Sequence, residues 1–288
     1  MIFTFHSVFP MNNIKETLDP MFVKNRLAQA IVVSYIIAHL LLLSRFADKC
    51  IVLSKPSERT LASEYKIEKA KILHIPHGVP SINLGRDVKS FREKYQVGDK
   101  RVISLVGWGH RTKGFHYLIR ALPLILKSVP DVAALITGGI RSADEKKRES
   151  YLEFLEKEVQ RAGVKDHVKI TGYLSDTELE VLLSITDVFV FPYEYRVNAS
   201  GAANMSLNAR KPLVVSNIPL FEDFVAEGLA IPVDPEDKEA LAGAVARCLT
   251  DNTLRSNVAG RIEDYVKRNS MENIAGKHYV LYRELMSK

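Results

Sequence analysis

Residues 188–216, VFVFPYEYRVNASGAANMSLNARKPLVVS, contain a strand, a turn, a helix and a second strand in that order. The apolar run VFVFPY is followed by a polar turn that ends in Asn198-Ala199-Ser200-Gly201, and a helix-forming stretch then leads into KPLVVS. This order makes one unit of a parallel sheet, in which ligands bind at the turn between the first strand and the helix. Unpaired backbone N–H groups and the positive end of the helix dipole meet there, so the segment predicts a site for an anion such as a diphosphate.

The composition is that of a chain with two ordinary domains. It has 288 residues, 47% of them hydrophobic, which is enough apolar material to fill two cores. Forty basic against 34 acidic side chains give a net charge of +6, which suits a phosphorylated ligand, an anionic membrane surface or nucleic acid equally. Cys50 and Cys248 lie far apart without metal-ligand spacing, so neither a disulfide framework nor a zinc site is predicted, and a reducing, cytoplasmic location is expected.

One apolar segment, residues 27–43, raises the question of a membrane. Its length is at the lower limit for spanning a bilayer, and Gln29, Ser34 and His39 interrupt it. These polar residues and the strand-like sequence that follows favour a helix buried within a domain over a membrane-seated one. Peripheral contact with the inner face of a membrane stays open as an alternative, because the segment is apolar and is followed by Arg45.

Strands and helices alternate along the chain, which predicts an α/β fold of parallel sheets with helices on both faces. We predict strands at residues 2–5, 50–54, 72–76, 102–107, 133–139, 168–173, 188–193 and 213–216. Besides the apolar helix, we predict helices at residues 56–64, 115–128, 144–162, 176–185, 201–210, 221–226, 238–250 and from 252 to the end. The polar, turn-rich stretch between the third and fourth strands places a domain boundary near Gly98.

The two predicted domains are unequal. The second, residues 99–265, has a complete set of strand and helix units, whereas the first, residues 1–98, has few and begins with a strand at residue 2. The last helix, residues 266–288, is expected to return toward the first domain. We therefore expect an incomplete N-terminal domain, either because the chain is a fragment or because a partner polypeptide completes that domain.

Several motifs resemble, in their order and spacing, the retaining, nucleotide-sugar-dependent glycosyltransferases of family 4. The matching segments are TFH (4–6), FADKCIVLS (46–54), KILHIPHGV (71–79), VGWGHRTKGFHYLIRAL (106–122), VKITGYLSDTELEVLLSITDVFVFPY (168–193), SGAANMSLNARKPLVVS (200–216) and HYVLYREL (278–285). The resemblance implies the GT-B fold of two facing Rossmann-like domains, the first on the acceptor side and the second binding the nucleotide sugar. It also implies transfer of the sugar to an acceptor hydroxyl with retention of configuration.

Such a reaction must stabilise the negative charge that develops on the departing diphosphate. Cations, backbone N–H groups or a divalent metal can do so. The sequence has no Asp-x-Asp element of the kind that holds a metal on a diphosphate, whereas Arg111 and Lys113 lie in a Gly-rich loop after the fourth strand. We therefore expect no metal and no cofactor besides the nucleotide sugar. No nucleophile elbow, Cys-His set or close acid pair is present, which agrees with a retaining reaction in which the donor phosphate receives the acceptor proton.

The Gly-rich loop supplies the first candidate residues. Lys113, before a glycine and an amphipathic helix, matches the family's phosphate-contacting lysine, although a solvated lysine at a helix start would look the same. Arg111 is a second candidate cation, with an ordinary surface role as the alternative. Many family members carry a Gly-Arg pair five residues before the lysine, where this chain has Gly107-Trp108. Gly109, in the same loop, is expected to approach the donor.

The polar turn after VFVFPY departs from the family pattern. Two glutamates separated by seven residues are usual there, and the matching positions are Val197 and Met205. Some relatives have a Ser-Gly turn in place of the first glutamate, and this chain looks like that variant. We expect Ser200-Gly201 to contact the diphosphate at the helix entry and Asn198 to line the same turn. Glu194 is expected to supply the missing carboxylate, or else to be a solvated loop acid.

Three further candidates complete the site. His6 matches the family histidine that follows a first-domain strand and faces the donor sugar, where an imidazole could hydrogen-bond the sugar. Tyr173 lies where the family's chain passes the nucleobase. Trp108, the only tryptophan, could stack on a base or sugar, or close the domain interface. For His6 and Tyr173 the alternative is a strand-end side chain without a function.

The predicted partners are a nucleotide-sugar donor and an acceptor that is a glycan, a lipid-linked molecule or a small molecule. No nucleic acid is predicted, because the charges are dispersed and aromatic residues are not interleaved with basic runs. A donor-binding or scaffolding subunit with little activity alone is the alternative to an enzyme. The absent glutamates and the short first domain motivate that alternative.

Overall fold

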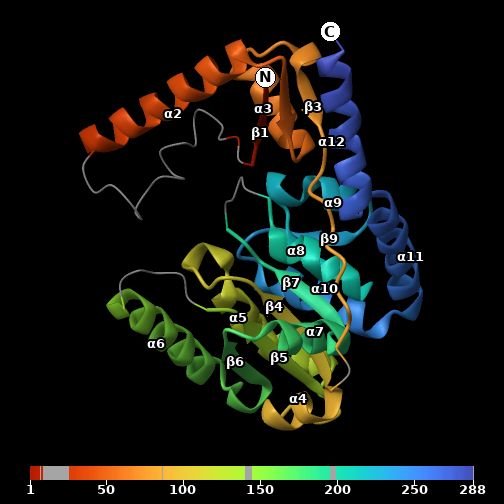
Figure 1. The fold of residues 1–288 in the computed structure, drawn as a ribbon. Helices are drawn as coiled ribbons and strands as arrows, with labels where there is room; N and C mark the ends of the chain where they lie inside the picture. Colours follow the sequence, from red (N-terminus) through yellow and green to blue (C-terminus); the bar gives the residue numbers. More distant parts are fainter. Residues whose placement is uncertain (7, 9–25, 86, 140–144, 195–198, 288) are drawn as a thin grey trace. The chain divides into compact units, whose positions relative to one another are not determined.

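The computed structural model describes residues 1–6, 8, 26–85, 87–139, 145–194 and 199–287, with only the backbone course of 26–30 and 145–148. It confirms the expected α/β architecture of parallel sheets in Rossmann-like domains (Figure 1). The chain divides into two compact units. The first contains residues 1–78 and 271–288 with a short segment that ends at Ser200, and the second contains residues 79–195 and 201–270.

The first unit holds a three-stranded parallel sheet in the order β1-β2-β3. Its elements are β1 (Ile2–Phe5), α2 (Arg26–Phe46), β2 (Lys49–Val52), α3 (Lys55–Ser63), β3 (Ile72–His74) and α12 (Met271–Met286). The central strand β2 ends in three completely buried residues, Cys50, Ile51 and Val52. Continuous apolar sequence of this kind is what a strand covered on both faces requires, and it made β2 readable from the sequence.

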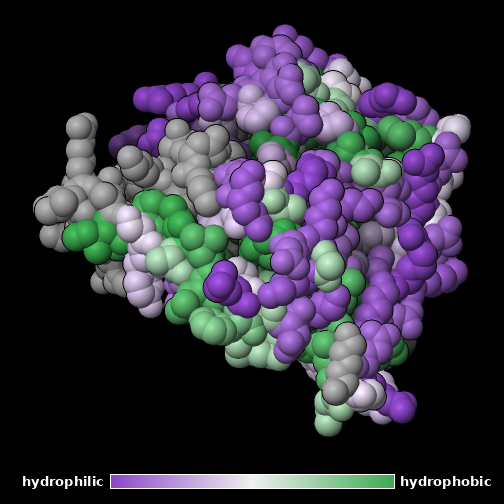
Figure 2. Space-filling model, turned by 90° about the horizontal axis from the view of Figure 1, so that it is seen from above, coloured by the Kyte–Doolittle hydropathy of each residue, from purple (hydrophilic) through white to green (hydrophobic). Residues whose placement is uncertain are grey.

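Helix α2 confirms the helix predicted over residues 27–43 but corrects the expectation that it is buried. Val33 and Leu40 are buried, whereas large apolar side chains elsewhere on the helix are exposed: Ile31, Tyr35, Leu41, Leu42 and Phe46. Figure 2 shows hydrophobic side chains gathered over this helix. The reason is that α2 is apolar on all sides, so packing along one side leaves the others uncovered. Among the residues that the structure describes, no helix has the length and apolar character needed to cross a bilayer.

The second unit is built on a six-stranded parallel sheet in the order β6-β5-β4-β7-β8-β9. Its strands are β4 (Arg101–Val106), β5 (Val132–Thr137), β6 (Val168–Gly172), β7 (Val188–Phe191), β8 (Leu213–Ser216) and β9 (Ala230–Val233). From β4 the chain adds β5 and β6 on one side and then returns to add β7, β8 and β9 on the other. The order therefore reverses between β4 and β7, and sheets of this kind bind ligands at the carboxyl ends of the strands at that switch point.

Helices cover both faces of this sheet (Figure 1). They are α4 (Val88–Lys94), α5 (Phe115–Ser128), α6 (Glu145–Ala162), α7 (Asp176–Ile185), α8 (Gly201–Ser206), α9 (Glu222–Ala226), α10 (Lys238–Thr250) and α11 (Asn252–Arg268). Strand β7 shows how two cores arise, since Phe189 and Phe191 pack into one cluster and Val188 and Val190 into the other. We call the cluster that contains Phe189 and Phe191 the phenylalanine cluster and the one that contains Val188 and Val190 the valine cluster. Helices α5, α6 and α10 pack in the valine cluster, and α4, α7, α8, α9 and α11 pack in the phenylalanine cluster.

Several elements differ from the sequence-based prediction. Strand β9 was not predicted, because it is short and contains Pro232, which an edge strand tolerates. The helix expected from residue 252 to the end is two helices, α11 and α12. They separate at Asn269, whose carbonyl accepts the N–H of Val79 over 2.8 Å. Helix α8 ends at Ser206, and Leu207–Ala209 continue as a short 3-10 helix.

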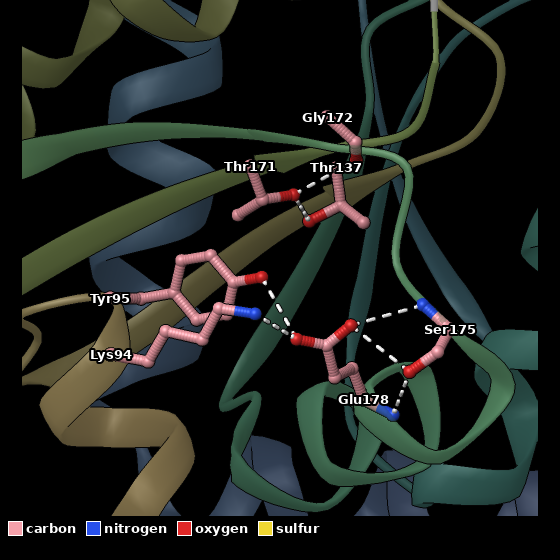
Figure 3. Close-up of polar contacts among 7 residues, drawn as sticks. All are labelled: Lys94, Tyr95, Thr137, Thr171, Gly172, Ser175 and Glu178. Carbon is pink, nitrogen blue, oxygen red and sulfur yellow. Dashed lines mark hydrogen bonds and ion pairs between the residues drawn. The ribbon is translucent and has the colours of Figure 1, made fainter.

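Helix α4, which the sequence did not predict, explains why the second unit begins at Val79 rather than near Gly98. Phe91 of α4 is buried in the phenylalanine cluster. Lys94 Nζ lies 2.6 Å from Glu178 Oε1 on α7, and the Tyr95 hydroxyl donates to the same oxygen over 3.3 Å (Figure 3). The polar stretch that resembled a linker therefore contains a helix packed in the second unit.

Candidate functional site

The carboxyl ends of β4 and β7 carry most of the predicted site residues, and their two loops are joined by backbone contacts. The N–H of Glu194, after β7, donates to the carbonyl of Thr112, after β4, over 3.0 Å. Gly114 has a φ of 66°, and a Cβ at this position would overlap the carbonyl oxygen of Pro192. Only glycine fits such a contact. Residues 112–114 and 192–194 are thus joined through their backbones, and we call the two segments together the loop block.

Lys113 lies in the loop block, above a buried aromatic ring. Its Nζ is 3.7 Å from the centroid of the Tyr193 ring, and Tyr193 is 0% exposed. The face of an aromatic ring attracts a cation, so this contact helps to hold the ammonium group at the carboxyl end of β7. The structure therefore places the predicted lysine at the switch point of the sheet.

Arg111 belongs to the same short helix as Lys113 but contacts a different element. Its guanidinium carbon is 5.0 Å from the centroid of the Phe154 ring on α6, and the side chain is exposed. Lys113 and Arg111 therefore lie over different aromatic rings, those of Tyr193 and Phe154. The structure brings Lys113 onto the loop after β7, and it holds Arg111 against α6.

Glu194 is fixed through both its main chain and its side chain. Besides the backbone bond to Thr112, its Oε1 accepts a hydrogen bond from the Tyr117 hydroxyl over 3.2 Å. Tyr117 is in the first turn of α5 and is 8% exposed. Burial, followed by the carboxylates of Glu194 and Glu236, raises the pKa of this hydroxyl. The phenol therefore stays protonated and donates across the neutral pH range.

Sequence reasoning missed Tyr117. Helix α5 was recognised by its apolar positions, and an aromatic residue among Phe115, Leu118 and Ile119 looks like one more core residue. One signal was available, because the helix starts directly after the Lys113-Gly114 pair, so its first turn lies at the carboxyl end of the sheet. A tyrosine hydroxyl in that turn lies near the predicted site, even when the tyrosine ring packs in the core.

The first turn of α8 is the third component of this region. A Cβ at Gly107, after β4, would lie 3.7 Å from Ala202 Cβ, so α8 begins beside the end of β4. Among the described residues, a Cβ at Gly201 would meet no atom within 4 Å, so open space lies next to this residue. Ser200 is buried and groups with the first unit. Asn198 lies outside the described residues.

An exposed aromatic pair lies at the carboxyl ends of β4 and β6. Trp108 is 52% exposed and Tyr173 70%, and their ring centroids are 5.9 Å apart. Gly139, after β5, lies against both, since a Cβ there would be 3.0 Å from Trp108 Cζ3 and 3.9 Å from Tyr173 Cβ. The N–H of Gly109 donates to the Gly139 carbonyl over 2.8 Å. Gly109 was predicted to approach the donor, and its backbone N–H is already used in this hydrogen bond.

His6 belongs to the first unit, where it directly follows β1 and is exposed. It lies at the carboxyl end of a parallel strand, as the sequence predicted. Within the described parts of the chain, no group of three or more His, Cys, Asp or Glu side chains is placed to hold a metal ion.

The chemistry of the second unit's carboxyl edge can now be stated. The ammonium group of Lys113 and the open space beside Gly201 suit an anionic ligand. Glu194 offers acceptor oxygens that suit hydroxyl groups. The flat, exposed faces of Trp108 and Tyr173 suit a ring.

Known proteins are similar to this chain in both sequence and structure. Residues 87–264 match the family described as glycosyl transferases group 1. The GDP-mannose-dependent alpha-(1-6)-phosphatidylinositol monomannoside mannosyltransferase of Mycolicibacterium smegmatis is 28% identical over 245 residues, covering 82% of this chain and 58% of that protein. An uncharacterized glycosyltransferase of Methanocaldococcus jannaschii is 29% identical over 244 residues, covering 82% and 60%. The chain thus spans less than two thirds of the length of either relative.

Solved structures agree with the fold. The crystal structure of Anabaena HepE in complex with UDP has a TM-score of 0.77 at 17% identity, covering 100% of this chain and 72% of that one. Sucrose-phosphate synthase from Thermosynechococcus elongatus has a TM-score of 0.73 at 25% identity, covering 99% and 68%. Because the family match spans more than half of the chain and most of its six-stranded unit, this protein belongs to the group 1 glycosyl transferases.

Proposed function

We propose that this chain is the donor-binding part of a retaining, family 4 glycosyltransferase that moves a sugar from a nucleoside diphosphate to an acceptor hydroxyl. The observation that carries the proposal is the position of Lys113, a cation held on the Tyr193 ring at the switch point between β4 and β7. Open parallel sheets bind their ligands at this point, and a diphosphate is an anion that a lysine there can stabilise. One relative is named for its dependence on GDP-mannose, and one similar structure contains UDP.

In this proposal the diphosphate lies between Lys113 and the first turn of α8. The open space beside Gly201 leaves room for a phosphate oxygen to approach the backbone. Ser200 and Asn198 stay predictions of the sequence for further polar contacts, and Arg111 would contribute positive charge from the other side of its loop. The nucleobase would stack on the Trp108–Tyr173 pair, whose exposed faces lie on the same edge of the sheet.

The proposed reaction breaks the bond between the sugar carbon and the diphosphate oxygen and forms a bond from that carbon to the acceptor oxygen. The acceptor hydroxyl approaches from the side of the leaving group, which retains the configuration, and its proton passes to the departing phosphate. Lys113 and backbone N–H groups stabilise the charge on that phosphate, so no metal ion is required. His6, in the first unit, stays a prediction of the sequence for contact with the donor sugar.

Binding of nucleoside diphosphates to this chain tests the proposal. GDP, UDP and ADP are added separately, and the melting temperature Tm is measured. A ligand that binds only the folded state at a hundred times its Kd stabilises it by about 2.7 kcal/mol, so at least one should raise Tm clearly. Lys113→Ala should reduce that shift. Lys127→Ala is the matched control, because Lys127 is an exposed lysine at the other end of the following helix, α5. If none of the three nucleotides shifts Tm, the proposed function is wrong.

A donor-binding subunit with little activity alone is the second candidate. It is favoured by Met205, which occupies the place of the second family glutamate and packs against the core of the second unit. Turnover separates the two candidates. A chain that binds the donor with ordinary affinity but neither transfers nor hydrolyses the sugar would be a binding subunit.

A further inference from the structure

We infer that Tyr117 is a positioning residue, whose hydroxyl fixes the Glu194 carboxylate so that this carboxylate can accept a hydrogen bond from the donor sugar. The inference rests on the proposed function and deepens it. It assigns a role in sugar recognition to a side chain that the sequence pattern presents as part of an apolar helix.

The Tyr117 hydroxyl is held in a fixed place by its surroundings. The backbone N–H of Tyr117 donates to the Gly114 carbonyl over 2.9 Å, which ties the residue to the loop block. Its ring centroid is 4.0 Å from that of His116, a buried side chain. A Cβ at Gly114 would be 2.8 Å from Tyr117 Cδ2, so the ring also packs on the glycine. These contacts leave the ring little room to move.

Glu194 has acceptor capacity left over for a ligand. A carboxylate offers about four acceptor positions. Among the hydrogen bonds between described residues, Tyr117 is the donor that reaches this carboxylate, at Oε1, and the side chain is partly exposed. Glu194 follows Tyr193, the residue whose ring lies beneath the Lys113 ammonium. Glu194 also belongs to the loop block that carries Lys113, so its carboxylate is attached to the same backbone as the proposed diphosphate contact.

The chemistry of Glu194 points to the sugar rather than to the phosphates. A carboxylate repels a diphosphate, and it cannot donate a hydrogen bond to phosphate oxygens. It accepts well from hydroxyl groups, which the sugar carries in number. A charged acceptor is most selective when it is held in one orientation, and the hydrogen bond from the Tyr117 hydroxyl, which Glu236 also approaches, restrains the Glu194 carboxylate.

Calorimetric binding with four probes tests the inference: UDP, UDP-glucose, GDP and GDP-mannose. The quantity of interest is the ratio of the Kd of the nucleotide sugar to that of its nucleoside diphosphate. In Tyr117→Phe, the Kd of the nucleoside diphosphate should stay within about twofold of the wild type, while the ratio rises about tenfold, as for loss of a hydrogen bond to a charged group. Tyr95→Phe is the matched control, since it removes a phenol that donates to Glu178 over a similar 3.3 Å. This control should leave the ratio unchanged.

A double-mutant cycle asks whether Tyr117 acts through Glu194. Glu194→Gln should raise the ratio as Tyr117→Phe does, and the double variant should raise it no further than either single change. Glu194 is partly exposed, so its substitution keeps the test valid if Tyr117→Phe proves unstable. An unchanged ratio, strictly additive losses, or an equal loss for nucleoside diphosphate and nucleotide sugar would overturn the inference alone. A wild-type chain that binds none of the four probes overturns the proposed function as well.

Discussion

Two tyrosine–glutamate pairs in the second unit make nearly the same hydrogen bond in different surroundings. Tyr95 donates to Glu178 over 3.3 Å, and Tyr117 donates to Glu194 over 3.2 Å. Glu178 also accepts from Lys94 and from the N–H and hydroxyl of Ser175, so its oxygens are occupied by its own chain (Figure 3). The difference separates two uses of a carboxylate. One joins helices α4 and α7, and the other accepts from a single side chain, Tyr117, among the described residues.

The largest expected effect comes from Gly114→Ala, which attacks the backbone on which the Tyr117–Glu194 pair depends. The new Cβ would overlap the Pro192 carbonyl in a left-handed conformation, so the free energy of unfolding should fall by more than about 2 kcal/mol. Urea denaturation measures this. Gly163→Ala is the control, because Gly163 has the same φ of 66° but open space around a Cβ. Its cost should be about 1 kcal/mol, and equal costs at both positions would show that the loop contact contributes nothing.

The next largest effect is expected from Tyr173→Ala, which tests how far the ligand-binding edge extends. The side chain is 70% exposed, so its removal should leave Tm almost unchanged. Loss of base stacking should weaken nucleoside diphosphate binding about tenfold. Pyrophosphate, which has no base, should bind Tyr173→Ala and wild type alike. Equal weakening for pyrophosphate would show that the Trp108–Tyr173 pair does not meet the base.

Acid should weaken the contacts of Glu178 that hold α4 against α7. The hydrogen bond from Lys94, followed by that from the Ser175 backbone, lowers the pKa of Glu178 from its ordinary 4.5 to about 2. The stabilisation is therefore complete above about pH 4.5 and is lost as the pH falls toward 2. The protection factors of the α4 amides, which correct for the pH dependence of intrinsic exchange, should fall over this range. Glu178→Gln should show fast exchange already at pH 6, with a Tm lower by a few degrees. An α4 whose exchange in the variant equals that of wild type at pH 6 would contradict the assignment.

The smallest effect on stability is expected from Gly201→Ala. This change tests the open space beside the first residue of α8. A Cβ there meets no atom of the described residues within 4 Å, so the free energy of unfolding should change by less than about 0.5 kcal/mol. The same methyl group would occupy the space proposed for a phosphate oxygen and should weaken nucleoside diphosphate binding severalfold. Unchanged affinity would move the diphosphate away from α8.

The sequence predicted most strands and the limits of α5, α7 and α10, because buried strands and amphipathic helices leave strong periodic patterns. It missed α4 and β9, whose patterns are short and polar or contain proline. Motif spacing located Lys113 at the strand end, where the structure has it. The Tyr117–Glu194 bond could not be predicted, because the partners are 77 residues apart and meet only through the register of β4 and β7. For the same reason, sequence could not tell that Arg111 and Lys113 contact different elements.

The loop block also has a mechanical consequence. Because the backbone of residues 112–114 is joined to that of 192–194, the Lys113 ammonium and the Glu194 carboxylate are carried by one connected stretch of backbone. In the proposed function, this shared backbone sets the spacing between the cation that meets the diphosphate and the carboxylate that meets the sugar.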